Sequence, residues 1–210
     1  MNQEIIKRIL SSIIIIAIAF FFIIKGSFFF IFFLSICFFI TSFEWYKMTK
    51  NKNYFLLGLV FLILSFLSAF LLRNIFLKDF FLVILICIST DIGGFVFGKI
   101  FKGSKLIKIS PNKTYSGMIG SFFLSIISAF FYTNYYDLIY WTDNVLFITV
   151  ILISSVSQIG DLTVSYFKRI SKIKNTGKII PGHGGLLDRI DGMIFAIPFA
   201  FIFLKVIKFI

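Results

Sequence analysis

Seven long apolar runs constrain the fold of this chain more than any other feature. They lie near residues 9–24, 27–43, 54–72, 79–98, 117–136, 144–164 and 192–209. Each is roughly 17–22 residues long, the length that a helix needs to cross a bilayer. Because backbone groups in lipid must pair within the segment, each run is predicted to be helical. The sequence therefore predicts an all-α integral membrane protein with about seven transmembrane helices.

The composition excludes a soluble domain of this size. Hydrophobic residues make up 59% of the 210 residues, and 32 of the residues are Phe. A soluble fold has no interior large enough for them, so the bilayer must be the solvent for most of the chain. We divide the chain into three N-terminal spans (residues 1–78) and a catalytic core (residues 79–210) with polar connections at 99–116 and 165–191.

The basic residues indicate how the helices are oriented. The net charge is +12, which in a soluble protein could indicate nucleic-acid binding. Here, however, the basic residues lie in short connections, and sixteen of the 21 fall on one side of the predicted membrane. By the positive-inside rule, the N-terminus and both long connections face the cytoplasm. We expect no nucleic-acid partner, and we interpret the first apolar run as a retained helix rather than a cleaved signal.

The rare acidic residues are the strongest functional signal. Only nine occur, and four gather at the predicted cytoplasmic helix ends: Asp91, Asp161, Asp188 and Asp191. A carboxylate at membrane depth is costly unless it faces a cavity, a cation or a basic partner. Structural ion pairs are the simpler alternative. Carboxylates on different helices can also hold Mg²⁺, so we predict that these four bind a metal.

Two further patterns indicate a polyphosphate site. Asp161, Ser165, Lys168 and Lys172 follow helical spacing and predict one polar stripe. The stretch from Lys178 to Gly185 contains three glycines just before a helix, which lets backbone N–H groups point at one anion. Separately, small residues recur every four positions at Gly117, Ser121, Ser125 and Ala129, which predicts close helix packing.

The polar connections resemble a known signature. Three segments closely resemble that of the phosphatidate cytidylyltransferase (CDP-diacylglycerol synthase) family: Ser165–Arg169, Lys174–Gly177 and Pro181–Asp191. Upstream, Asp91, Ser110–Thr114 and Gly160–Leu162 resemble other motifs of that family. The resemblance covers about residues 88–192. The chain has Asn175 and Ser116 where the family usually has acidic residues.

The resemblance implies that CTP and phosphatidic acid react to give CDP-diacylglycerol and pyrophosphate. It also implies Mg²⁺ or another hard divalent cation, with room for a second cation. Asp161 and Asp188 would bind the metal, with Asp191 and Asp91 as ligands or neighbours. The phosphates would be neutralised by Lys168, Arg169, Lys178, His183 and Arg189. The nucleotide would be held by Ser110, Lys113, Thr114, Ser165, Gly182, Gly184 and Gly185.

The same resemblance implies a multi-pass protein of the bacterial inner membrane, with its active site at the cytoplasmic helix ends. It leaves open whether two copies form a homodimer. Three alternatives remain: a CTP-dependent kinase of a polyprenol or phytol-like alcohol, a transporter that uses Asp91 and Asp161, and a non-catalytic membrane scaffold.

Overall fold

The computed structural model describes residues 3–50, 52–107, 110–138, 141–180 and 184–209. Most of them are helical. The long helices are α1 (Gln3–Lys25), α2 (Ser27–Thr49), α3 (Phe55–Ile75), α4 (Leu77–Phe101), α5 (Tyr115–Tyr135), α6 (Asp143–Ile170) and α8 (Met193–Phe209). A four-residue helix, α7 (Leu187–Ile190), precedes α8. An antiparallel hairpin of β1 (Lys105–Ile107) and β2 (Ser110–Thr114) joins α4 to α5.

The helices have the length and composition of membrane spans. Within the described residues, five helices, α2 to α6, are long and apolar enough to cross a bilayer. Two shorter apolar stretches, Ile14–Lys25 and Met193–Ile207, lie in α1 and α8. The prediction of a helical, multi-pass membrane protein is therefore confirmed, and the long helices coincide with the seven apolar runs.

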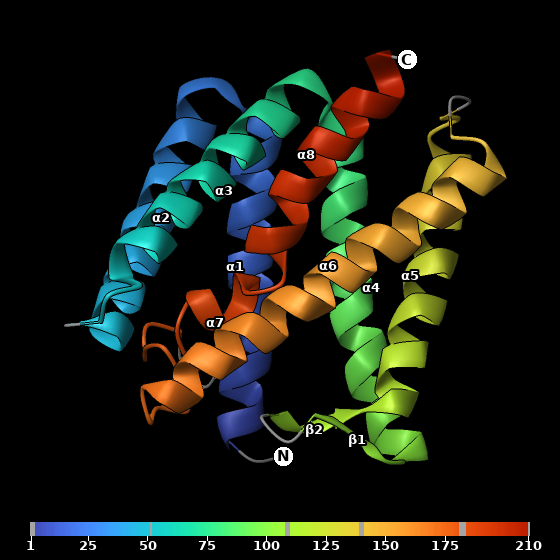
Figure 1. The fold of residues 1–210 in the computed structure, drawn as a ribbon. Coiled ribbons are helices and arrows are strands. Elements are labelled where there is room, and N and C mark those ends of the chain that lie inside the picture. The colour runs from blue at the N-terminus through green and yellow to red at the C-terminus, as the bar shows by residue number, and fades with distance from the viewer. Residues whose placement is uncertain (1–2, 51, 108–109, 139–140, 181–183, 210) are drawn as a thin grey trace.

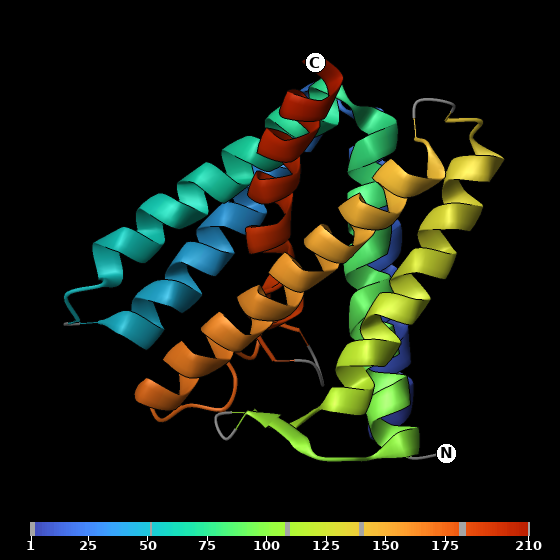
Figure 2. The same cartoon turned by 45° about the vertical axis from the view of Figure 1, so that its right-hand side comes forward.

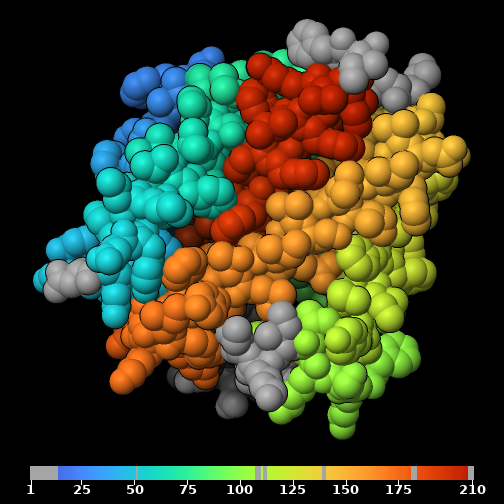
Figure 3. Space-filling view, in the orientation of Figure 1, coloured from blue at the N-terminus to red at the C-terminus, as the bar shows by residue number. Residues whose placement is uncertain are grey.

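The long helices do not run parallel to one another. In Figures 1 and 2, α4 and α5 lie side by side, and α6 crosses the bundle obliquely. The space-filling view shows α6 as a diagonal band, with α8 on one side and α5 on the other (Figure 3). The hairpin and α7 lie at the end of the molecule where the chain begins, and the C-terminus lies at the opposite end (Figure 1).

Small residues explain how closely α4 and α5 approach. Gly93 faces the backbone of Gly120 so closely that a Cβ atom there would collide with the Gly120 carbonyl. Ser121 donates a hydrogen bond of 2.7 Å to the carbonyl of Thr90 across the same interface. The predicted small-residue stripe on α5 is buried, which confirms its role in packing.

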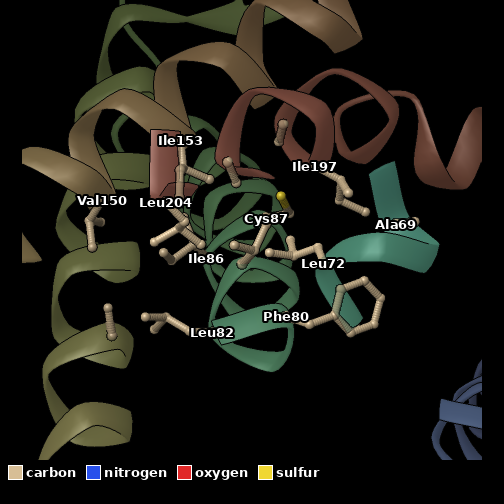
Figure 4. Close-up of a cluster of buried hydrophobic side chains, with 14 of the residues drawn as sticks. Ala69, Leu72, Phe80, Leu82, Ile86, Cys87, Val150, Ile153, Ile197 and Leu204 are labelled. Carbon is tan, nitrogen blue, oxygen red and sulfur yellow. The ribbon is translucent and has the colours of Figure 1, made fainter. Parts of the chain in front are cut away.

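An apolar core joins α4 to α3, α6 and α8. Ile86 and Cys87 of α4 are fully buried and belong to the same hydrophobic cluster as Leu72, Ile153 and Leu204. Figure 4 shows these side chains converging from their separate helices. The core anchors α4 and α6, which carry Asp91 and Asp161 toward the hairpin end.

Two predicted boundaries need correction. The polar connection predicted at 99–116 starts later, because α4 continues to Phe101, and it contains the hairpin. The connection predicted at 165–191 starts later, because α6 continues to Ile170. Val164 and Phe167, near this end of α6, pack in a hydrophobic cluster. Lys172 lies beyond the end of α6 with a φ of 55°, so the predicted polar stripe ends at Lys168.

Candidate active site

A polar cavity of about 310 Å³ lies where α4, α5 and α6 meet the hairpin and α7. Its lining includes all four carboxylates singled out in the sequence: Asp91, Asp161, Asp188 and Asp191. Lys113 and Arg189 are the basic residues of the lining. The cavity therefore brings together acidic residues that are up to 100 positions apart in the chain.

Lys168 links α6 to α7 at this cavity. Its Nζ lies 2.9 Å from Oδ1 of Asp188 and 3.9 Å from Oδ2 of Asp191. The other oxygen of Asp188, Oδ2, accepts hydrogen bonds from the backbone N–H groups of Thr176 (2.8 Å) and Gly185 (3.1 Å). Burial alone would raise the pKa of Asp188, but Lys168 and these two N–H groups hold it below its ordinary value. Asp188 is thus a charged carboxylate fixed on both sides.

Asp161 of α6 also lines the cavity. It forms an ion pair with Lys113 of the hairpin, and Oγ of Ser165 lies 3.4 Å from its Oδ1. Asp191 lies near Asp161 and has no ion-pair partner closer than Lys168 within the described residues. Burial, and then the negative charge of Asp161, raise the pKa of Asp191 well above its ordinary value. The site gathers more negative charge than its own lysines neutralise.

The donor chemistry of the cavity fits a hard cation. Within the described ranges, no three His, Cys, Asp or Glu side chains are already arranged to coordinate a metal ion. Asp91, Asp161 and Asp191 nevertheless line one cavity and repel one another, and carboxylate oxygens are the ligands that Mg²⁺ prefers.

Of the other predicted residues, some line the cavity, some lie outside it, and two are not described by the structure. Thr114 lines the cavity beside Lys113, whereas Ser110 begins strand β2 and pairs with Ile107. Arg169 and Lys178 are exposed and do not belong to the cavity lining. Gly182 and His183 lie outside the described residues, so their roles stay predictions.

Two loop glycines pack against carboxylates. Gly184 has a φ of 91°, and a Cβ atom there would lie 2.9 Å from Oδ2 of Asp188. Gly185 donates its N–H to Asp188, and a Cβ atom there would lie about 2.5 Å from Oε2 of Glu44. Their absent side chains leave room for these two acids, a role that the sequence did not reveal.

Sequence reasoning also missed several polar residues of the site. Thr90, Ser121 and Gln158 line the inner part of the cavity, and Thr90 donates a 2.8 Å hydrogen bond to Ser154. Isolated polar residues are common in membrane helices, so the sequence did not mark Thr90 or Gln158, and it marked Ser121 only as a residue of helix packing. Glu44 was missed as well, although its position as a rare acid at the end of an apolar run was a usable signal.

A second cavity, of about 530 Å³, is almost entirely apolar. It lies between α1, α2, α3, α4 and α8, and residues such as Ile84, Ile88 and Ile197 line it. Arg189 lines both the apolar and the polar cavity. One basic residue is therefore shared between a charged cavity and an apolar cavity.

Comparisons with known proteins agree with the character of this site. A model of the Cytidylyltransferase family matches residues 54–207 of the chain. A protein of Rickettsia bellii named phosphatidate cytidylyltransferase is 39% identical over 175 residues, which cover 75% of this chain and 72% of that protein.

Two further proteins carry the same name. One, from Rickettsia felis, is 34% identical over 212 residues and covers 95% of this chain and 92% of its own length. Another, from Staphylococcus epidermidis, is 32% identical over 172 residues, which cover 79% of this chain and 65% of that protein. The region that the family model matches, residues 54–207, includes all four carboxylates that line the polar cavity.

Proposed function

The chain belongs to the cytidylyltransferase family, and from this premise we propose that it transfers the cytidylyl group of CTP to phosphatidate, giving CDP-diacylglycerol and pyrophosphate. The observation that carries the proposal is the position of Arg189, which borders both a polar cavity rich in carboxylates and an apolar cavity. A lipid phosphate and a nucleotide triphosphate need this combination of compartments, with the phosphates meeting at the boundary.

The reaction needs charge neutralisation more than it needs a base. The lipid phosphate is already an anion at neutral pH, so its oxygen can attack the α-phosphorus of CTP without losing a proton to the enzyme. Attack forms the new P–O bond and breaks the bond to the β-phosphate, which leaves as pyrophosphate. Repulsion between the two anions is the main obstacle, and we assign Lys113, Lys168 and Arg189 to reduce it.

A divalent cation such as Mg²⁺ completes this charge balance in our proposal. Asp161, Asp191 and Asp91 would hold it, because their oxygens line the cavity and repel one another. When bound, such a cation withdraws charge from the phosphate oxygens and neutralises the leaving pyrophosphate. Asp188 would act mainly by fixing Lys168, since Lys168, Thr176 and Gly185 already occupy its oxygens.

We further propose that all seven long helices span the inner membrane of a bacterial cell, with the N-terminus and the polar cavity on the cytoplasmic side. The bias of Lys and Arg toward the connections at that end supports this orientation. CTP would then enter from water, and phosphatidate would enter from the inner leaflet with its acyl chains in the apolar cavity.

Two forms of labelled CTP test the proposed reaction. Purified protein in detergent is incubated with phosphatidate, Mg²⁺ and CTP labelled at either the α- or the γ-phosphate. We expect α-label in the lipid product and γ-label in pyrophosphate. Transfer of γ-label to a lipid alcohol would instead identify a kinase, and failure of both labels to reach lipid would contradict the proposal.

An Asp161→Asn variant and a chelator test the metal site in the same assay. The amide keeps the shape of the side chain but removes its charge, and we expect a loss of at least about 100-fold in kcat. Removal of divalent cations with EDTA should abolish turnover, and added Mg²⁺ should restore it. Full activity in EDTA would rule out the proposed cation.

A further inference from the structure

Glu44 lies far from the signature residues in the sequence but makes direct contacts with them in the fold. It belongs to α2, in the part of the chain that precedes the matched family region, and only 1% of its surface is exposed. The hydroxyl of Thr176 donates a 2.9 Å hydrogen bond to its Oε2. The backbone N–H groups of Leu186 and Leu187 donate to Oε1 at 3.0 Å and to Oε2 at 2.8 Å.

The surrounding chain is shaped to receive this carboxylate. A Cβ atom at Gly177 would lie 2.6 Å from Oε1 of Glu44, and one at Gly185 would lie at a similar distance from both oxygens. Two glycines therefore leave the space that the carboxylate fills. Leu186 and Leu187 open α7, so their N–H groups have no partner within that helix and Glu44 supplies one.

Each of these contacts leads directly to Asp188. Thr176 donates its hydroxyl to Glu44 and its backbone N–H to Oδ2 of Asp188, which joins the two carboxylates through one residue. Asp188 follows Leu187 in the chain, and its other oxygen accepts the hydrogen bond from Lys168. The orientation of Asp188, and hence of Lys168, thus depends on where Glu44 holds Thr176 and the start of α7.

We propose that Glu44 is a positioning residue for cytidylyl transfer, acting from the N-terminal helices on the Asp188–Lys168 pair. The proposal rests on the proposed function for its effect on catalysis, but the contact itself can be tested without turnover. A misplacement of about 1 Å in catalytic groups can lower a rate on the order of 100-fold. Loss of the contacts that hold Asp188 and Lys168 in place should therefore have a measurable effect on kcat.

Glu44→Gln is the most informative variant. An amide has one oxygen, whereas the three donors approach both oxygens of Glu44, so an NH₂ group must face at least one N–H or O–H donor. We expect kcat to fall by about 10- to 100-fold. The KM for phosphatidate should stay within about twofold, because the apolar cavity does not include Glu44.

Hydrogen–deuterium exchange supplies a readout that does not need activity. Glu44→Gln should raise exchange in residues 174–180 and 184–190 without raising it in the core helices. Thr41→Val is the matched control, because Thr41 is also fully buried in α2 but, among the described residues, its hydroxyl bonds only to the carbonyls of Cys37 and Phe38 of its own helix. That control should leave both kcat and exchange unchanged.

Thr176 provides a second pair of variants in case Glu44→Gln fails to fold. Thr176→Ser keeps the hydroxyl and should retain activity, whereas Thr176→Val should lower kcat about tenfold. Because both substitutions disturb the same set of contacts around the Glu44 carboxylate, Glu44→Gln combined with Thr176→Val should lose less than the product of the single effects.

The outcomes separate this proposal from the proposed function. If the wild-type protein makes no CDP-lipid, the proposed function fails, and the exchange experiment still decides whether Glu44 holds the segment. Wild-type exchange and kcat in Glu44→Gln would overturn the positioning role, and so would equal kcat in Thr176→Val and Thr176→Ser.

Discussion

Lys168 is a buried cation whose two carboxyl partners lie in α7 and just after its end. The residue is 9% exposed, and the side chain of Asp188 that it contacts at 2.9 Å is 5% exposed. Asp191 lies within 3.9 Å of the same ammonium group. Without Lys168, the two carboxyl groups would be left without this basic partner in a poorly solvated place, and this is costly because water is largely excluded.

We therefore predict that Lys168→Met lowers both stability and activity. Removing one partner of a buried ion pair destabilises by roughly 3–5 kcal/mol, because the other charge remains unpaired. The kcat for CDP-lipid should fall by on the order of 100-fold, since a cation beside the phosphates is lost. Thermal unfolding in detergent and the labelled-CTP assay measure the two effects.

Lys172→Met is the matched control for this substitution. Lys172 is exposed, lies beyond the end of α6, and forms no ion pair among those that the described residues show. We expect its unfolding temperature and kcat to match those of the wild type. Equal stability of Lys168→Met and Lys172→Met would contradict the buried-pair argument.

At the scale of single residues, the sequence identified the charged side chains of the site better than the residues that hold them in position. Asp91, Asp161, Asp188 and Asp191 could be found because acids are rare in an apolar chain and costly in lipid. Glu44 could not be assigned a role, since its partners are 132 to 143 residues away and two of them are backbone N–H groups. Backbone donors leave no trace in residue type.

Among the helices, the α4–α5 pair is the one that most directly positions the cavity. Gly93 and Gly94 of α4 face Gly117, Gly120 and Ser121 of α5, and there is no room for a Cβ atom at Gly93. Asp91 lies on α4 only two residues before Gly93, and both Gly94 and Gly117 line the cavity. A change in the separation of these helices would therefore change the cavity.

We predict that Gly93→Ala forces α4 and α5 apart. Overpacking of a close interface costs about 1–3 kcal/mol, and the obstacle here is backbone rather than a flexible side chain. We expect a lower unfolding temperature and a several-fold loss of kcat. Ile100→Ala on the exposed surface of the same helix is the control and should change neither value. A Gly93→Ala protein as stable as the wild type would show that the helices can separate freely.

The hairpin between α4 and α5 is an element that the sequence did not predict. Its strands have three and five residues, and a two-stranded hairpin of this size is marginal on its own. A contact with the rest of the molecule supports it, because Lys113 forms an ion pair with Asp161 of α6. At the base of the hairpin, Tyr115 donates its N–H to the carbonyl of Ser104. The helices could be predicted from apolar length, because lipid imposes that length, but no such rule applies to the hairpin.

For the whole molecule, the apolar runs predict that helices cross a bilayer but not how they cross one another. The 28 residues of α6 span about 42 Å as a helix, which exceeds the hydrocarbon thickness of about 30 Å. A helix of this length tilts or extends beyond the hydrocarbon, and α6 crosses the bundle obliquely (Figures 1 and 2). The polar cavity and the apolar cavity both depend on such crossings, so neither could be predicted from spacing along the chain.

Arg189 lines both cavities, so a lipid with its phosphate at Arg189 would place its acyl chains in the apolar cavity. Ile88 of α4 lines the apolar cavity and is 37% exposed, so its replacement by Trp should fill part of that space. If acyl chains bind there, each methylene group kept out of the cavity loses about 0.8 kcal/mol of transfer free energy. The exclusion of two methylene groups would raise the KM for a long-chain phosphatidate by about tenfold.

Substrate length and a second tryptophan make this test specific. A short-chain phosphatidate should be affected less than a long-chain one. The KM for CTP should stay unchanged, because we propose that CTP binds in the polar cavity. Ile119→Trp is the control, since Ile119 is 64% exposed on α5 and lines neither cavity. An equal rise in KM for both chain lengths, or the same rise with Ile119→Trp, would show that the acyl chains bind elsewhere. A selective rise for the long chain would place the lipid across Arg189, with its phosphate facing the carboxylates and its chains facing α1 to α4.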